Sequence, residues 1–243
     1  MQQSNAYIIV FSIITTVILG GLLAAASVGL GPLQKEQVEL DTKKSILSAV
    51  IEIQEGDDVL LIYKEQIESL VVDFQGNVVE QDAEGNPLIA ENVSIEQNYK
   101  MDPESRLYPV FRFKAKGSDE VEAYILPIFG AGLWDVIWGY VALDKDLNTI
   151  KGVVFDHRGE TPGLGARIAE KDIQGRFIEK QVYDANGTLI SVSMLKGEGN
   201  PAESLGPHSV DGLAGATITA RGVNDMIKNY LEYYRNYLDK ISS

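Results

Sequence analysis

The sequence contains no cysteine, so the chain has no disulfide framework, no cysteine-ligated zinc or iron–sulfur cluster and no catalytic thiol. It has only two histidines, His157 and His208, and no H-E-x-x-H pairing, which argues against a zinc hydrolase. The G-x-S-x-G elbow and the G-x-x-x-x-G-K-[ST] phosphate loop are also missing. Gly130 and Gly132 begin a dinucleotide fingerprint, but Asp135 stands where its third glycine belongs. These absences leave no catalytic residue and no metal ligand to nominate.

The chain up to Gln34 lacks charge of either sign, because all 21 Lys and Arg and all 35 Asp and Glu residues follow it. The net charge is −14 and the pI is about 4.6. Nucleic-acid binders carry clustered positive charge, so we expect no nucleic-acid partner. The composition, 45% hydrophobic and 23% charged, is that of a globular protein, and the charged part is long enough for one large domain or two small ones.

The uncharged segment contains an unbroken, mostly apolar run over residues 7–30. As a helix it would span about 36 Å, enough for a hydrocarbon core of about 30 Å. Gly31-Pro32 is expected to end it, because proline breaks a helix interior. A cleaved signal peptide is the alternative, since residues 24–27 resemble a cleavage site. However, the run has no basic residue before it and is too long, so we expect a retained single-span anchor.

The remaining chain alternates helical and strand patterns, which predicts an α+β fold with a mainly antiparallel sheet. Asp57 and Asp58 are expected to cap the second helix. The predicted helices cover residues 34–53, as a helix that continues from the membrane, 57–74 and 218–240, with short helices within 163–179. The predicted strands cover residues 108–114, 121–128, 136–143, 150–156 and 187–194.

Two glycine-rich segments are candidate binding sites. Residues 157–166 hold three glycines and a proline, so their backbone can approach a ligand closely, although spacing alone favours a plain surface turn. Residues 211–219 have mostly small side chains and run directly into the N-terminus of the last helix. Free N–H groups and the helix dipole make this position suitable for a phosphate. For Thr217 and Thr219 the physics leaves three possibilities open: a bound phosphate, a covalently attached phosphate, or a helix cap.

Three segments resemble motifs of a known family. DGLAGAT at residues 211–217 resembles the D-x-x-[ST]-G-A-T sequon of flavinylated proteins, with Ala214 in place of the usual Ser or Thr. GETPGLG at 159–165 resembles the family's second signature. GAGLWDVIWGY at 130–140 resembles the G-x-G-L-W stretch of one branch, the C subunits of the Na⁺-translocating NADH:quinone oxidoreductases. The sequon also occurs in the G subunits of Rnf-type electron transport complexes, but the GAGLW segment favours the C subunits.

This resemblance implies a covalent FMN, joined through its phosphate to the hydroxyl of Thr217. A flavin ring needs a flat apolar slot with a few polar groups, for which Leu133 is one candidate wall. The other implied cofactor-binding residues are Asp211, Gly215, Ala216 and Thr219 around the sequon, Glu160, Thr161, Leu164 and Gly165 in the second signature, and Trp134. The implied division is an N-terminal tail (1–6), a transmembrane helix (7–30), a helical linker or first lobe (31–100) and an FMN-binding domain (101–243).

The implied function is a membrane-anchored flavoprotein subunit that relays single electrons within a Na⁺-pumping NADH:quinone reductase, a translocase. It is not expected to oxidise NADH alone, because the chain offers no nicotinamide site. The implied partners are the other subunits, membrane lipid and a flavin transferase that uses FAD as FMN donor. The alternatives are the G subunit of an Rnf-type complex and a non-redox, membrane-anchored assembly protein.

The resemblance also bears on orientation. It implies a single pass through the bacterial inner membrane with the large domain in the periplasm. The basic residues after the span, Lys35, Lys43 and Lys44, would instead place that domain in the cytoplasm. We follow the resemblance, because long domains translocate largely regardless of charge.

Overall fold

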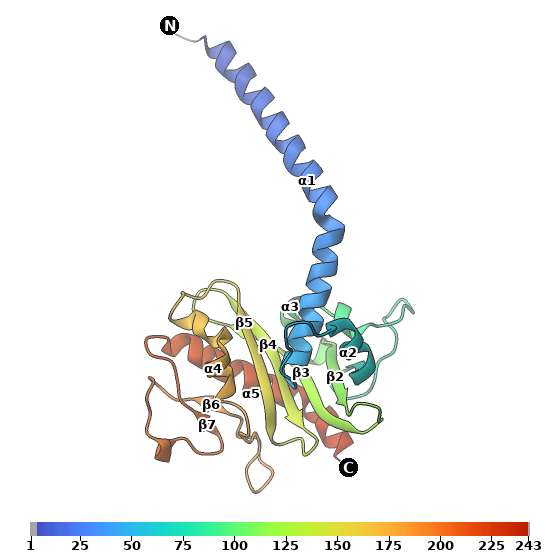
Figure 1. Ribbon diagram of the computed structural model, residues 1–243, viewed down its shortest axis with the longest axis vertical. Coiled ribbons are helices and arrows are strands. Elements are labelled where there is room, and N and C mark those ends of the chain that lie inside the picture. The colour runs from blue at the N-terminus through green and yellow to red at the C-terminus, as the bar shows by residue number, and fades with distance from the viewer. Residues whose placement is uncertain (1–3, 243) are drawn as a thin grey trace. The chain divides into compact units, whose positions relative to one another are not determined.

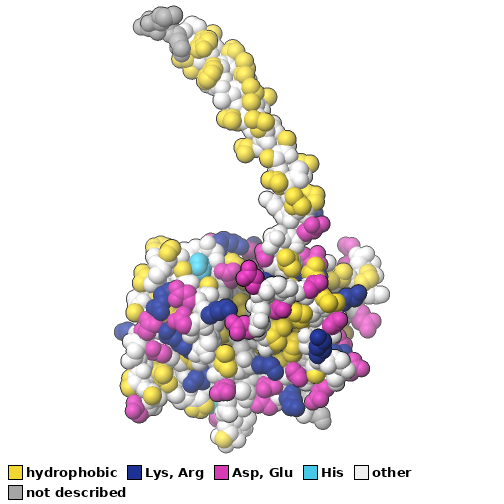
Figure 2. Space-filling model, viewed as in Figure 1, with side chains coloured by type: hydrophobic (Ala, Val, Ile, Leu, Met, Phe, Trp, Pro, Cys, Tyr) yellow, Lys and Arg dark blue, Asp and Glu magenta, His cyan; other side chains and the backbone are white. Residues whose placement is uncertain are grey.

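The computed structural model describes residues 4–242, so residues 1–3 of the predicted tail and Ser243 lie outside the described part. The chain divides into two compact units, Met1–Thr42 and Lys43–Ser243. Helix α1 (Asn5–Ser48) fills the first unit and ends inside the second. Among the described residues it is the one helix long and apolar enough to cross a membrane, and none of its most apolar window is buried. Figure 2 shows the apolar side chains along it.

The prediction that the first helix ends at Gly31-Pro32 was wrong. Helix α1 continues through Pro32 to Ser48 without a break. A proline removes one backbone hydrogen bond from a helix interior, but the Leu, Gln, Lys and Glu residues that follow it favour the helix and carry it onward. The helix predicted over residues 34–53 does continue from the apolar segment, as the end of α1, but it stops five residues early.

The second unit is built on a five-stranded antiparallel sheet with its strands in chain order, β1-β2-β3-β4-β5 (Figure 1). Four of these strands were predicted within a few residues, and the predicted α+β class is confirmed. The strands are β1 Ile67–Val72, β2 Tyr108–Lys114, β3 Val121–Ala131, β4 Val136–Asp144 and β5 Ile150–His157. The helices after α1 are α2 Val59–Gln66, α3 Ile95–Tyr99, α4 Lys171–Gly175 and α5 Thr217–Ile241, with 3-10 turns at Ala90–Asn92, Pro103–Ser105, Gly165–Ala169 and Ala202–Ser204.

The segment before the sheet was only half predicted. Asp58 caps α2 as expected, and its carboxylate accepts the N–H of Leu61 at 3.0 Å. The continuation of this helix to Phe74 was wrong, because Ile67–Val72 is strand β1. Pairing with β2, far along the sequence, buries the last two side chains of β1, and this tertiary contact overrides the local helical spacing.

The strand predicted over residues 187–194 was also largely wrong. Only β6 (Ser193–Met194) is a strand there, and it pairs in parallel with β7 (Ser209–Val210). The residues before it form a tight turn, in which the N–H of Asp184 donates to the carbonyl of Thr188 at 3.0 Å. The short helices expected within 163–179 are the 3-10 turn Gly165–Ala169 and α4.

The sheet is covered on both faces. Helix α5 packs on one face, where Tyr234 donates a hydrogen bond of 2.7 Å to the carbonyl of Pro109. Gly130 of β3 faces Met226 there so closely that a Cβ would lie 2.9 Å from the Met226 side chain. The opposite face carries residues 46–49, with Ala49 against Gly152 of β5. Gly222 in the first part of α5 lies so close to the end of β3 that a Cβ would lie 2.3 Å from the Ala131 carbonyl oxygen.

Candidate functional site

A buried carboxylate, Glu160, lies where the three sequence segments meet. Its Oε1 accepts the backbone N–H groups of Leu133 at 2.8 Å and Trp134 at 3.0 Å. Its Oε2 accepts the hydroxyl of Thr219, in the first turn of α5, at 2.5 Å. The side chain is only 4% exposed. One carboxylate therefore ties together the β3–β4 hairpin, the glycine-rich segment 157–166 that carries Glu160, and α5.

The hydrogen bonds to Glu160 favour its ionised form. Burial raises the pKa of this carboxyl, but the hydrogen bonds from Thr219, Trp134 and Leu133 outweigh it and hold the pKa below its usual value. The position of this carboxylate also explains why residues 132 and 165 are glycines. A Cβ on Gly132 or on Gly165 would lie 2.4 Å from a Glu160 oxygen, so only glycine lets both loops approach it.

The start of α5 has no side-chain cap. The N-cap residue is Ala216, and no side chain accepts a hydrogen bond there. The possibility that Thr217 or Thr219 caps the helix is therefore wrong: Thr219 donates to Glu160, and no described residue hydrogen-bonds to the partly exposed Thr217 hydroxyl. The first N–H groups of an α-helix have no partner within it. They point from the same turn that carries the Thr217 hydroxyl.

Exposed apolar side chains surround this helix start. Trp134 is 70% exposed, and Leu133, Leu164 and Ile218 are each exposed by more than two fifths. The Trp134 indole N–H donates to the Thr161 hydroxyl at 3.1 Å, and a Cβ on Gly215 would lie 3.0 Å from Leu164. Large exposed apolar groups gathered beside polar ones mark a binding surface.

The predicted site residues thus fall into two groups. Thr217, Gly215, Leu164, Thr161 and Trp134 lie at the exposed surface. Glu160, Gly165, Ala216 and Thr219 are buried beneath it and hold the segments together. Ile218 was not predicted, although its place between the two threonines could have indicated it.

Asp211 holds a loop rather than facing the helix start. Its carboxylate accepts the backbone N–H groups of Gly199 at 2.8 Å and Asn200 at 3.0 Å, and the Asn200 side chain at 2.7 Å. Burial raises the pKa of this carboxyl, but these hydrogen bonds and the nearby Arg176 outweigh it and lower the pKa. Asp211 therefore fixes the beginning of the sequon to the loop before it.

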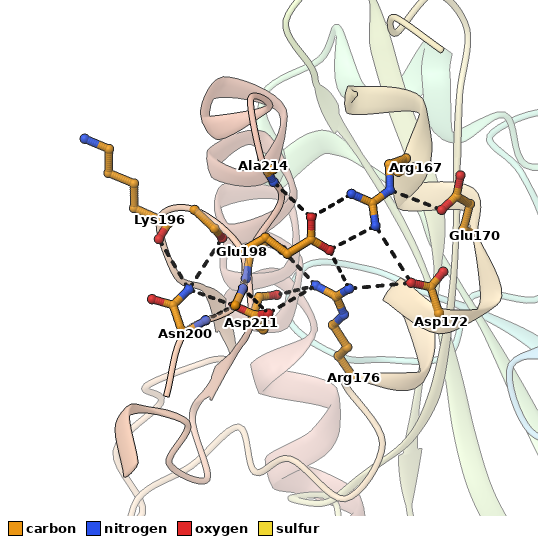
Figure 3. A network of polar contacts seen from close by, with 12 residues as sticks. Arg167, Glu170, Asp172, Arg176, Lys196, Glu198, Asn200, Asp211 and Ala214 are labelled. Atoms are coloured by element: carbon orange, nitrogen blue, oxygen red, sulfur yellow. Dashed lines mark hydrogen bonds and ion pairs between the residues drawn. The ribbon is translucent and has the colours of Figure 1, made fainter. Parts of the chain in front are cut away.

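A cluster of charged side chains beside Asp211 was not predicted from the sequence (Figure 3). Arg167 and Arg176 both bind the carboxylate of Glu198, with N–O distances from 2.7 to 2.9 Å. The outer partners are Glu170, 3.2 Å from Arg167, and Asp172, 3.5 Å from Arg176. These residues come from the 3-10 turn Gly165–Ala169 and the residue after it, from α4 and the residue after it, and from the loop that carries Glu198, so no single sequence pattern marked them. In the described part of the chain, no three acidic or histidine side chains are placed to hold a metal ion.

Comparison with known proteins identifies the family. The model of the FMN-binding domain family matches residues 132–232, a range that includes Trp134, Glu160 and Thr217. The Na⁺-translocating NADH-quinone reductase C subunit of Pseudomonas aeruginosa is 31% identical over 95% of this chain and 92% of its own length. That of Vibrio anguillarum is 33% identical over 92% and 87%. This chain belongs to the family of C subunits of the Na⁺-translocating NADH-quinone reductases.

Solved structures agree with this assignment. The crystal structure of the C subunit from Parabacteroides distasonis is 33% identical, covers 86% of this chain and 96% of its own, and superposes with a TM-score of 0.72. The structure of Shewanella oneidensis NqrC is 26% identical, covers 84% and 97%, and gives a TM-score of 0.69. The GAGLW segment thus correctly favoured the C subunits over the Rnf-type G subunits. The chain is a flavoprotein subunit of a translocase complex.

The residues at the start of α5 fit an FMN. The uncapped first turn offers N–H groups and a dipole to a phosphate. Beside it, the exposed side chains of Leu133, Trp134 and Leu164 offer an apolar surface to a ring. Among the described residues, no side chain accepts a hydrogen bond at the N-cap of α5, so the N–H groups of its first turn are available to a phosphate.

Proposed function

We propose that this chain is a membrane-anchored single-electron carrier whose FMN is joined through a phosphoester to the hydroxyl oxygen of Thr217. The observation that carries the proposal is the partly exposed Thr217 hydroxyl, without a hydrogen-bond partner among the described residues, on the uncapped first turn of α5. A threonine that capped the helix would have its oxygen engaged by a backbone N–H. The bound flavin would supply the ability to accept and donate one electron at a time.

The attachment reaction needs a flavin dinucleotide as donor. The Thr217 oxygen forms a bond to the FMN phosphorus of FAD, the P–O bond of the pyrophosphate breaks, and AMP leaves while the hydroxyl loses its proton. A flavin transferase would catalyse this exchange. The helix dipole and the free N–H groups of α5 would then stabilise the negative phosphoester. The apolar side chains of Leu133, Trp134 and Leu164 would offer a surface to the ring and exclude water from it.

Thr217→Ala tests the attachment. We expect flavin fluorescence to stay with the denatured wild-type protein on a gel after co-expression with the transferase, and to be lost in Thr217→Ala. Thr217→Ser is the matched control, because it keeps a hydroxyl at the same place and should retain fluorescence. A non-fluorescent wild type, or a fluorescent Thr217→Ala, would contradict the proposal.

The same variant separates an electron carrier from an assembly protein. A reductase complex that contains Thr217→Ala should assemble with all its subunits and lose NADH:quinone activity. Undiminished activity in such a complex, with FMN absent from this chain, would favour the non-redox assembly role.

The proposed location is the bacterial inner membrane, with α1 as a single span in lipid and the domain in the periplasm. The length and the exposed apolar surface of α1 support the span. Protease added to intact spheroplasts should digest the domain, whereas a cytoplasmic domain would be cut only after lysis.

A further inference from the structure

The sequon segment is held in place by charged side chains outside all three signatures. The Glu198 Oε2 accepts the backbone N–H of Ala214 at 3.3 Å. Two arginines hold this carboxylate: Arg167 at 2.7 and 2.9 Å, and Arg176 at 2.8 Å. We call Arg167, Arg176 and Glu198 the Glu198 clamp (Figure 3).

Arg176 also binds the sequon backbone directly. Its Nη1 donates to the carbonyl of Gly212 at 2.8 Å and to that of Asp211 at 3.3 Å. A Cβ on Gly212 would lie 1.8 Å from the Leu195 carbonyl oxygen, so the segment is pressed against the preceding loop. From residue 211 to residue 214, the backbone is therefore fixed by hydrogen bonds from outside the segment.

The surroundings of Glu198 in the clamp favour its ionised form. The side chains of Arg167 and Arg176 are each 21% exposed and that of Glu198 is 24% exposed, so the pairs are largely shielded from water. Hydrogen bonds from Arg167 and Arg176, and then from the Ala214 N–H, hold the pKa of Glu198 far below its usual value. Charge-assisted, bidentate arginine–carboxylate pairs are stronger and more directional than neutral hydrogen bonds.

The free part of the sequon begins where the clamp ends. Gly215 is exposed and has a φ of +70°, a conformation that glycine adopts without cost. The chain then turns into α5 and presents Thr217. A loop that is ordered before it meets an enzyme loses less conformational entropy on binding.

We propose that Arg167, Arg176 and Glu198 are positioning residues for flavin attachment, which fix residues 211–214 so that Thr217 meets the transferase in a preformed conformation. This inference rests on the proposed function, because it concerns the same acceptor threonine. Without the clamp, only those molecules in which residues 211–214 are ordered can accept FMN from the transferase. The apparent affinity of the transferase is then its affinity for the ordered form multiplied by the fraction of ordered molecules.

The test measures flavin transfer to the purified full-length protein in detergent, with purified transferase and FAD, over a range of acceptor concentrations. Glu198→Ala should raise the KM for the acceptor about tenfold and leave kcat nearly unchanged. The lost hydrogen bond orders the acceptor before it binds the transferase and takes no part in the transfer itself. Glu203→Ala is the matched control: it removes an exposed carboxylate five residues away and should behave as the wild type. Glu198→Gln keeps an acceptor for the Ala214 N–H and should restore part of the affinity.

Hydrogen exchange shows whether the effect is local. In Glu198→Ala the amide of Ala214 should exchange faster, while the amides of α5 and β3 keep their protection. If Glu198→Ala fails to fold, Arg167→Lys replaces it, since lysine keeps the charge but loses the bidentate contact.

An unchanged KM in Glu198→Ala, or lost protection throughout α5 and β3, would overturn the inference. A wild-type protein that receives no FMN would instead overturn the proposed function. The two failures are therefore distinguishable.

Discussion

At the scale of single residues, Glu160 carries the geometry of the site. Its two oxygens join Leu133 and Trp134 on one side and Thr219 on the other. The loops that it joins are far apart in sequence, and only glycines at positions 132 and 165 allow them to come so close. Glu160 thus acts beneath the exposed surface, through the residues that it positions.

Glu160→Gln should destabilise the protein and change its response to acid. The amide keeps only one acceptor oxygen and no charge, so it loses the charge-assisted hydrogen bonds that the two carboxylate oxygens make to Leu133, Trp134 and Thr219. We expect this to cost about 1–3 kcal/mol of unfolding free energy at neutral pH. In the wild type the folded pKa of Glu160 is lowered, so its contribution is present above the unfolded pKa of about 4.3 and is lost as the pH falls through the folded value. Urea unfolding at several pH values should therefore give a shallower acid dependence for Glu160→Gln. An equally steep dependence would mean that other carboxylates determine the acid response.

The sequence predicted some residues of the site but not how they act. Thr217 and the second signature were found by resemblance, yet the burial of Glu160 was not foreseen. The clamp residues Arg167, Arg176 and Glu198 were not predicted at all. Arg167 lies in a 3-10 turn, Arg176 directly follows α4 and Glu198 lies in a loop. Ion pairs between such separate short segments leave no periodic pattern in a sequence.

At the scale of elements, prediction succeeded where the local sequence carries a clear signal. Strands β2 to β5 are runs rich in β-branched and aromatic residues. Helix α5 repeats apolar residues with helical spacing. Prediction failed for Ile67–Val72, whose spacing fits a helix but whose partner strand β2 lies beyond a long irregular segment. It failed again over 187–192, where a turn interrupts the expected strand.

The contact between α5 and the sheet offers an element-scale prediction. The Tyr234 hydroxyl is buried and donates to the carbonyl of Pro109 at 2.7 Å, with Pro127 at 3.3 Å. Tyr234→Phe leaves these carbonyls without that donor and should lower the unfolding free energy by about 1–2 kcal/mol. Tyr233→Phe, one residue earlier and partly exposed, should change it by less than about 0.5 kcal/mol. Equal effects of the two variants in urea unfolding would show that the hydrogen bond contributes nothing.

At the scale of the whole molecule, the two compact units have different surfaces. Up to Thr42, α1 exposes nearly all its apolar side chains, as expected for a helix in contact with lipid. On the second unit, acidic and basic side chains are interspersed over the visible face (Figure 2). The boundary lies inside α1, so its last residues belong to the domain: Ile46 and Leu47 are fully buried there.

Two truncations test this boundary. A chain that begins at Lys43 keeps Ile46, Leu47 and Ala49 in the core and loses the exposed apolar helix, so it should be soluble without detergent and fold cooperatively. A chain that begins at Glu52 loses these side chains, and burying two aliphatic residues is worth about 3–6 kcal/mol. Since a domain is stable by only about 5–15 kcal/mol, this shorter chain should unfold at a much lower temperature or aggregate. Equal melting temperatures by circular dichroism would place the boundary of the domain after residue 51.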